Sequence, residues 1–247
     1  MLFNSDKFDY IDQTNNEIYN ILKIQLNNDN SKPYLITLPG FSEKSFNTTS
    51  HIIINNSGKI SDIFNSIYII CVPKLFKNLQ ITACNKRDTI LNNRKISLLT
   101  KEEYIQVFSP EIELNIRLAG YIDNLIKNII PPYKTIHLLG KCAGAGVMIK
   151  LFAINHYYHA LYLGVPACPT NVEDIIINGR KIIIAFDKRD AYEFPWGKSN
   201  EEILSYKKTL EPSTNYIVEE FNDNKDYDTK KYHEIPDQLF DLIRINN

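Results

Sequence analysis

Residues 135–148, TIHLLGKCAGAGVM, carry the pattern that decides the fold. The first five, Thr135–Leu139, form a mainly apolar run of strand length, and a glycine-rich turn follows them directly. A helical pattern then resumes through Met148, Leu151 and Phe152. A strand that turns tightly into a helix is the repeating unit of a parallel sheet with right-handed crossovers. This stretch therefore predicts an α/β protein.

Strand-like and helix-like patterns alternate on both sides of this stretch. Ile67–Val72 (IYIICV) is almost wholly apolar and ends at Pro73, as expected for a strand buried on both faces. Glu111–Ile130 has apolar residues at three- and four-residue steps after Ser109-Pro110, which favours a helix that starts there. The remaining predicted strands are Ile18–Leu26 (at a sheet edge), Tyr34–Leu38, His159–Leu163, Lys181–Phe186 and Asn215–Phe221, and the remaining predicted helices are Ser199–Leu210 and Pro236–Ile245.

These elements predict a single α/β domain over residues 1–247, built on a doubly wound, mostly parallel sheet flanked by helices. Residues 1–32 are expected to form an N-terminal edge segment. Residues 74–109 have mixed polarity without a clean period, so their secondary structure stays unassigned at this point. Little or no lid is expected, because only a short segment separates the strands predicted at 159–163 and 181–186.

Composition and charge narrow the classes of function. The 247 residues include 28 basic and 29 acidic side chains, a formal net charge of −1, so nothing favours nucleic acid or an anionic membrane as a partner. No apolar run approaches the roughly 18 residues of a membrane span, and the N-terminus lacks a signal-peptide pattern. We therefore expect a cytoplasmic protein. The cysteines have neither zinc-site nor disulfide-framework spacing, and no metal or cofactor is expected; they are Cys71, Cys84, Cys142 and Cys168.

The glycine-rich turn has the sequence G-x-C-x-G over Gly140–Gly144. Such a turn holds its central residue in a strained conformation that points the side chain out at the carboxyl edge of the sheet. The small residues on either side let strand and helix approach closely, and the helix N-terminus favours a thiolate at Cys142. The pattern does not fit a G-x-x-x-x-G-K-[ST] phosphate loop or G-x-G-x-x-G. A buried structural cysteine in a tight turn is the alternative interpretation.

Candidate acids and a histidine follow Cys142 along the chain. The predicted strand Lys181–Phe186 leads into Asp187 and Asp190, which places acids just beyond the carboxyl end of a strand. His233 comes near the end of the chain, after a further strand and a polar loop. The order nucleophile, acid, histidine is typical of an α/β sheet with a nucleophile turn.

From about Pro33 to its end, the sequence resembles the α/β-hydrolase family, and its cysteine, aspartate and histidine resemble the Cys-Asp-His triad of dienelactone hydrolases. The resemblance implies that Cys142 is the nucleophile, His233 the base and Asp190 the partner of the histidine. Asp190 matches the family pattern better than Asp187, because an apolar-Pro pair, Phe194-Pro195, follows it; Asp187 stays open as the acid.

The resemblance also implies an oxyanion hole. Leu38–Ser42 (LPGFS) resembles the His-Gly-x strand end of the family, with Pro39 in place of the frequent histidine. The backbone N–H groups of Phe41 and Ala143 would then bind the developing oxyanion. No arginine matches the carboxylate-binding arginine of the dienelactone hydrolases.

The predicted function is hydrolysis of an ester, lactone or thioester through an acyl-cysteine intermediate, with a small-molecule acyl substrate as the partner. An acyltransferase with the same intermediate, and a non-catalytic binding protein of the same fold, are the alternatives. His137 is expected to be a core or sheet-face residue. Lys141 and Arg189 flank predicted triad members; a preference for an anionic substrate is one interpretation of their charges, and solvation of both charges is the more common one.

Overall fold

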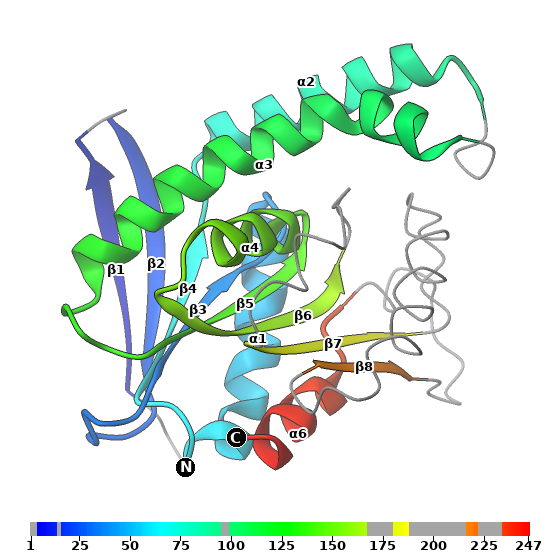
Figure 1. Cartoon of the computed structure of the whole chain (residues 1–247). Helices are drawn as coiled ribbons and strands as arrows, with labels where there is room; N and C mark the ends of the chain where they lie inside the picture. The colour runs from blue at the N-terminus through cyan, green and yellow to red at the C-terminus, as the bar shows by residue number, and fades with distance from the viewer. Residues whose placement is uncertain (1–3, 14–15, 95–98, 167–179, 188–215, 222–233) are drawn as a thin grey trace.

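The computed structural model describes residues 4–13, 16–94, 99–166, 180–187, 216–221 and 234–247. Within these residues, eight strands form one sheet in the order β1-β2-β4-β3-β5-β6-β7-β8 (Figure 1). β2 runs antiparallel to both β1 and β4, whereas all other neighbouring strands are parallel, which confirms the mostly parallel sheet. The strands are β1 (Asn4–Asp12), β2 (Glu17–Gln25), β3 (Tyr34–Leu38), β4 (Ser66–Cys71), β5 (Ile136–Cys142), β6 (Tyr158–Pro166), β7 (Lys181–Asp187) and β8 (Tyr216–Phe221).

Helices cover both faces of this sheet. One face carries α2 (Lys74–Leu91), α3 (Lys101–Ile129) and α4 (Ala143–Ile154), and the other carries α1 (Glu43–Ile60) and α6 (Asp237–Ile245) (Figure 1). The chain is therefore doubly wound, as predicted.

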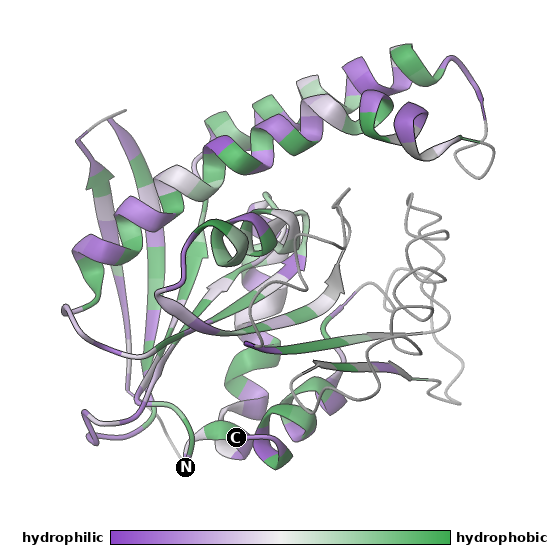
Figure 2. Cartoon of the chain, in the orientation of Figure 1, coloured by the Kyte–Doolittle hydropathy of each residue, from purple (hydrophilic) through white to green (hydrophobic). Residues whose placement is uncertain are grey.

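Each face of the sheet has its own apolar core. From β5, Ile136 and Leu138 belong to the core under α3 and α4, whereas Leu139 belongs to the core under α1 and α6. Successive strand residues point to opposite faces, so a strand covered on both sides must be apolar at nearly every position. Figure 2 shows the central strands as largely hydrophobic, while α2 and α3 alternate between hydrophobic and hydrophilic residues.

The start predicted for α3, after Ser109-Pro110, is wrong. The helix begins at Lys101, because Thr100 and Glu103 form a capping box there. Pro110 lies inside α3, where it has no N–H to donate to the carbonyl of Gln106 four residues earlier. The hydroxyl of Ser109 donates to that carbonyl instead, at 3.0 Å. The Ser-Pro pair is therefore accommodated within the helix and does not start it.

The segment without a clean pattern, residues 74–109, contains α2 and the first part of α3. Only Phe76 and Ala83 of α2 are buried, so the apolar residues of this helix do not repeat at the three- and four-residue steps of a buried face. α1 was not predicted for a related reason: its buried face includes four polar residues, Thr49, Ser50, Asn56 and Ser57. A polar residue that packs inward is invisible to a search for apolar periodicity.

The N-terminal segment forms the sheet edge, but with a different strand outermost. β1 is the edge strand, and seven of its nine residues are exposed. β2, predicted as the edge strand, is enclosed between β1 and β4. The helix predicted at 199–210 lies outside the described residues. Among the helices that the structure describes, none is both long enough and apolar enough to span a membrane.

Candidate active site

The glycine-rich turn lies where β5 ends and α4 begins. Cys142 is the last residue of β5 and directly precedes Ala143, the first residue of α4. Its backbone has φ 52° and ψ −130°. A residue other than glycine in such a conformation costs about 1–3 kcal/mol, which the surrounding structure must supply. A strained, partly exposed cysteine at the carboxyl end of a central strand has the geometry of a nucleophile turn.

Gly140 and Gly144 make this turn sterically possible. A Cβ on Gly140 would lie 2.6 Å from the Cα of Ala145, and a Cβ on Gly144 would lie 2.2 Å from the carbonyl oxygen of Leu38. Both contacts are with backbone, which cannot rotate away as a side chain can. The G-x-C-x-G spacing is therefore required by two close approaches, of β5 to α4 and of α4 to the end of β3.

The segment after β3 lies against the cysteine. A Cβ on Gly40 would be 3.5 Å from the Sγ of Cys142. The N–H of Gly40 donates to the hydroxyl of Ser45 at 3.0 Å, which ties this segment to the first turn of α1. Phe41 is buried, with 5% of its surface exposed. The two residues predicted as oxyanion donors, Phe41 and Ala143, thus belong to segments that are in direct contact.

Lys141, the residue before the cysteine, was expected to be solvated, but it is buried. Only 3% of it is exposed, and its Nζ lies 2.5 Å from the Oε2 of Glu234. Charged groups are buried only when paired, so the position of Glu234 explains how β5 can contain a lysine. Next in the chain, Ile235 packs on β6, and a Cβ on Gly164 would lie 2.9 Å from its Cγ1. Residues 234 and 235 therefore lie over β5 and β6, beside the nucleophile turn.

His137 is a core residue, as predicted. It is 7% exposed, and its Nδ1 lies 2.8 Å from the hydroxyl of Tyr162. Burial lowers the pKa of His137 to about 3, with smaller effects from the charges of His159 and Lys181. The neutral imidazole is a structural part of the core and not a candidate base.

The other two cysteines of the described chain have thiols that hold their protons. Burial, and then the carboxylate of Glu43, raise the pKa of Cys71. Burial and a hydrogen bond to Glu111 raise the pKa of Cys84 to about 12. Neither thiol is therefore a good candidate nucleophile near neutral pH.

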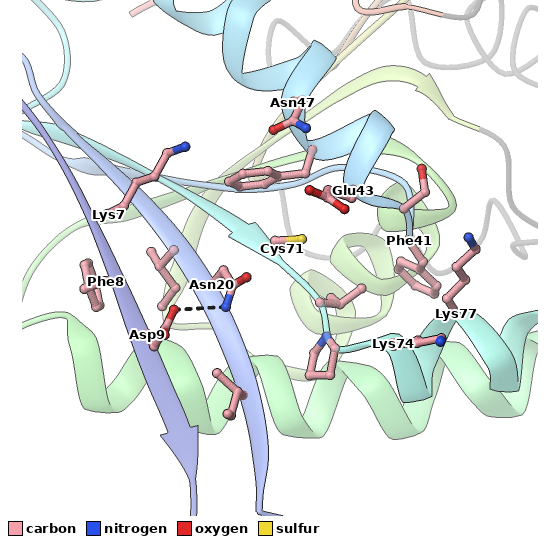
Figure 3. A pocket seen from close by; sticks show the side chains of 16 residues that line it. Lys7, Phe8, Asp9, Asn20, Phe41, Glu43, Asn47, Cys71, Lys74 and Lys77 are labelled. Carbon is pink, nitrogen blue, oxygen red and sulfur yellow. Dashed lines mark hydrogen bonds between the residues drawn. The ribbon is translucent and has the colours of Figure 1, made fainter.

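A cavity of about 780 Å³ is lined by Phe41, the residue that follows Gly40 (Figure 3). Its wall combines the segment after β3, the carboxyl end of β4 and the first turns of α1 and α2 with parts of β1 and β2. Sequence reasoning missed it because its charged residues come from elements that were not predicted. The available signal was Lys74 and Lys77, two lysines in the first turns of a helix that has no acid there.

Two predicted site residues, Asp190 and His233, lie outside the described part of the chain, so their predicted roles stay predictions. Asp187 is the last residue of β7, at the carboxyl edge of the sheet. In the described residues, His, Cys, Asp and Glu side chains do not gather in threes as a metal ion would require.

Known proteins relate to this chain through structure alone. No family model and no curated protein matches the sequence. A predicted CIB-like hydrolase from Thermoplasma acidophilum is 13% identical, with a TM-score of 0.54 over 98% of this chain and 97% of that one. An esterase from Pyrobaculum calidifontis is 10% identical, with a TM-score of 0.52 over 98% and 83%. An IroE-like serine hydrolase from Shewanella oneidensis is 12% identical, with a TM-score of 0.52 over 99% and 79%.

These similarities extend over almost the whole chain. This chain has the α/β-hydrolase fold. The fold prediction is confirmed. In an α/β-hydrolase fold, a G-x-S-x-G turn exposes its central residue at the top of the sheet, and Cys142 occupies that place here.

Proposed function

We propose that this protein is a hydrolase of esters, lactones or thioesters, with Cys142 as the nucleophile, His233 as the base and Asp190 as the partner of the histidine. The observation that carries the proposal is the backbone of Cys142, held at φ 52° between β5 and α4 and directly beside Gly40. Strain of this kind persists only where the surrounding structure enforces it, and it concentrates at functional sites. Residues 1–247 are taken as one domain in this proposal.

The proposed reaction has two steps. The thiolate of Cys142 attacks the substrate carbonyl, and the N–H groups of Phe41 and Ala143 bind the negative charge that forms on the oxygen. Protonated His233 then gives its proton to the leaving alcohol or thiol as the acyl-cysteine forms. In the second step His233 takes a proton from water, whose oxygen attacks the acyl group and releases an acid and the thiolate.

The path of the chain supports His233 as the base. Glu234, which follows it directly, is paired with Lys141, which directly precedes Cys142. Ile235 packs against Gly164, whose neighbour across the sheet is again Lys141. The segment that begins one residue after His233 is thus attached beside the nucleophile turn.

The names of the structural neighbours, an esterase and hydrolases, support an ester as the bond cleaved. One of these neighbours is a serine hydrolase, whereas this chain has cysteine at the corresponding turn. Cysteine is a stronger nucleophile than serine near neutral pH, and a thiolate is a better leaving group than an alkoxide. We therefore expect activated esters and thioesters to react faster than amides. The resemblance to dienelactone hydrolases stays a prediction.

Substitution of the nucleophile tests the proposal. We expect Cys142→Ala to abolish hydrolysis of 4-nitrophenyl butyrate. Cys142→Ser should lose most of this activity, because a serine hydroxyl is a much weaker acid than a thiol and depends on a base during the attack. Circular dichroism should show both variants folded. Wild-type activity in Cys142→Ala would remove the nucleophile and with it the proposed function. Product analysis with added alcohols identifies acyl transfer, the alternative fate of the same intermediate.

A second pair of variants assigns the acid. Asp190→Asn should lower kcat strongly, because an imidazole without its carboxylate partner adopts the wrong tautomer. Asp187→Asn is the matched change three residues earlier and should have a much smaller effect. The reverse result would assign the acid to Asp187 and leave the nucleophile unaffected.

A further inference from the structure

The cavity beside Phe41 has an uneven distribution of charge. Its wall contains three lysines and two acids, which are Lys7, Lys74, Lys77, Asp9 and Glu43. Both acids have favourable surroundings. The carboxylate of Asp9 accepts a hydrogen bond from Asn20 at 2.9 Å, and Glu43 lies in the first turn of α1, where a negative charge is stabilised. None of the three lysines has an ion-pair partner within the described ranges of the chain.

Two of these lysines are in an unfavourable place for a cation. Lys74 and Lys77 lie in the first turns of α2, where no acid and no capping side chain offsets the positive end of the helix. Figure 3 shows both on the Phe41 side of the cavity, with Lys7 and Asp9 on the opposite side. Cys71 and Glu43 lie between the two sides. The end of the cavity next to the predicted oxyanion hole is therefore the positive end.

An anion at this end would be bound by both lysines and would also relieve their repulsion by the helix terminus. The cavity is large enough for a small organic group, with about 780 Å³ of space. Phe41 lines the cavity and directly follows Gly40, the residue beside Cys142, so the cavity adjoins the segment that carries one predicted oxyanion donor.

We propose that the substrate carries an anionic group, a carboxylate or a phosphate, which binds between Lys74 and Lys77 while the reacting carbonyl lies at Cys142. This inference rests on the proposed function and deepens it by naming the substrate class. Lys141, the only lysine adjacent to the nucleophile in the sequence, is already paired with Glu234, so the charge recognition falls to α2.

Matched esters test the charge preference. Mono-4-nitrophenyl glutarate and 4-nitrophenyl valerate differ at the acyl end, by a carboxylate in place of a methyl group. The acetate esters of 4-hydroxybenzoate and of phenol differ by a carboxylate in the leaving group. In at least one pair, the wild-type protein should have the higher kcat/KM for the anionic ester. The Lys74→Gln/Lys77→Gln double variant should lower that ratio by roughly 3- to 10-fold at low ionic strength, and salt should lower it in the wild type.

The matched control is Lys44→Gln, which removes an exposed lysine from the first turn of α1 without changing the cavity wall. It should keep the wild-type ratio in both pairs. Binding of glutarate, measured by calorimetry at low salt, gives a readout that needs no catalysis. Ester hydrolysis with no lysine-dependent preference in either pair would overturn this inference and keep the proposed function. Lysine-dependent glutarate binding without any ester hydrolysis would overturn the proposed function and keep the anion site.

Discussion

Replacing Glu234 with glutamine should destabilise the protein more than replacing the lysine to which it is paired. Lys141 is 3% exposed at its side chain, whereas Glu234 is 28% exposed. Glu234→Gln leaves a buried ammonium group without its counter-charge, a situation that costs about 3–5 kcal/mol when the partner is removed entirely. Because glutamine keeps one acceptor oxygen, we expect a smaller loss, about 2–3 kcal/mol. Lys141→Met leaves a carboxylate that water can reach, so about 1 kcal/mol is expected.

The double variant Lys141→Met/Glu234→Gln should recover most of the stability that Glu234→Gln loses, because it contains neither of the two charges. Urea denaturation of the four proteins gives the coupling free energy, which we expect to be about 2 kcal/mol. In thermal unfolding, each kcal/mol should shift Tm by roughly 2–4 °C for a chain of this size.

The chain offers a matched control in Lys59 and Asp241, which are 2.9 Å apart with 36% and 39% of their side chains exposed. Asp241→Asn should cost less than about 1 kcal/mol, because water screens an exposed pair. Equal losses in Glu234→Gln and Asp241→Asn would refute the reasoning from burial, as would a larger loss in Lys141→Met than in Glu234→Gln.

Three further results are expected. Gly144→Ala should prevent stable folding or expression, because its Cβ would lie 2.2 Å from a backbone oxygen, whereas Gly120→Ala, with nothing within 4 Å on an exposed helix, should add about 0.5–1 kcal/mol in urea denaturation. Burial lowers the pKa of His137 to about 3, so the unfolded chain takes up the proton first, from about pH 6.5 downward. Below pH 6.5 the free energy of unfolding should therefore fall by up to about 1.4 kcal/mol per pH unit, more steeply than in His137→Gln. Equal slopes in the two proteins would contradict the burial of a neutral His137. Mass-spectrometric mapping of iodoacetamide labelling at neutral pH should find Cys84, whose pKa is raised to about 12, far slower than Cys142, and rapid labelling of Cys84 in the folded protein would contradict its burial.

The strands of the central sheet were predictable because each is specified by its own side chains. β3 was predicted with its bounds as observed, and β5 was recognised from the run that enters the glycine-rich turn. α1 and α2 were not predicted, since α1 buries Thr49 and Asn56 and α2 buries little. A method that looks for apolar periodicity succeeds where burial and polarity agree and fails where they differ.

By itself, the sequence determined the α/β class, most of the strands and the turn that presents Cys142, because apolar runs and the steric freedom of glycine act within a few neighbouring residues. Only the tertiary structure decided the strand order, the burial of Lys141 and the cavity beside Phe41. Whether a charge is solvated depends on which distant segment covers it, and Glu234 lies 93 residues from its partner. The cavity likewise takes its lysines from β1 and α2, so the positive charge exists as a group only after the chain has folded.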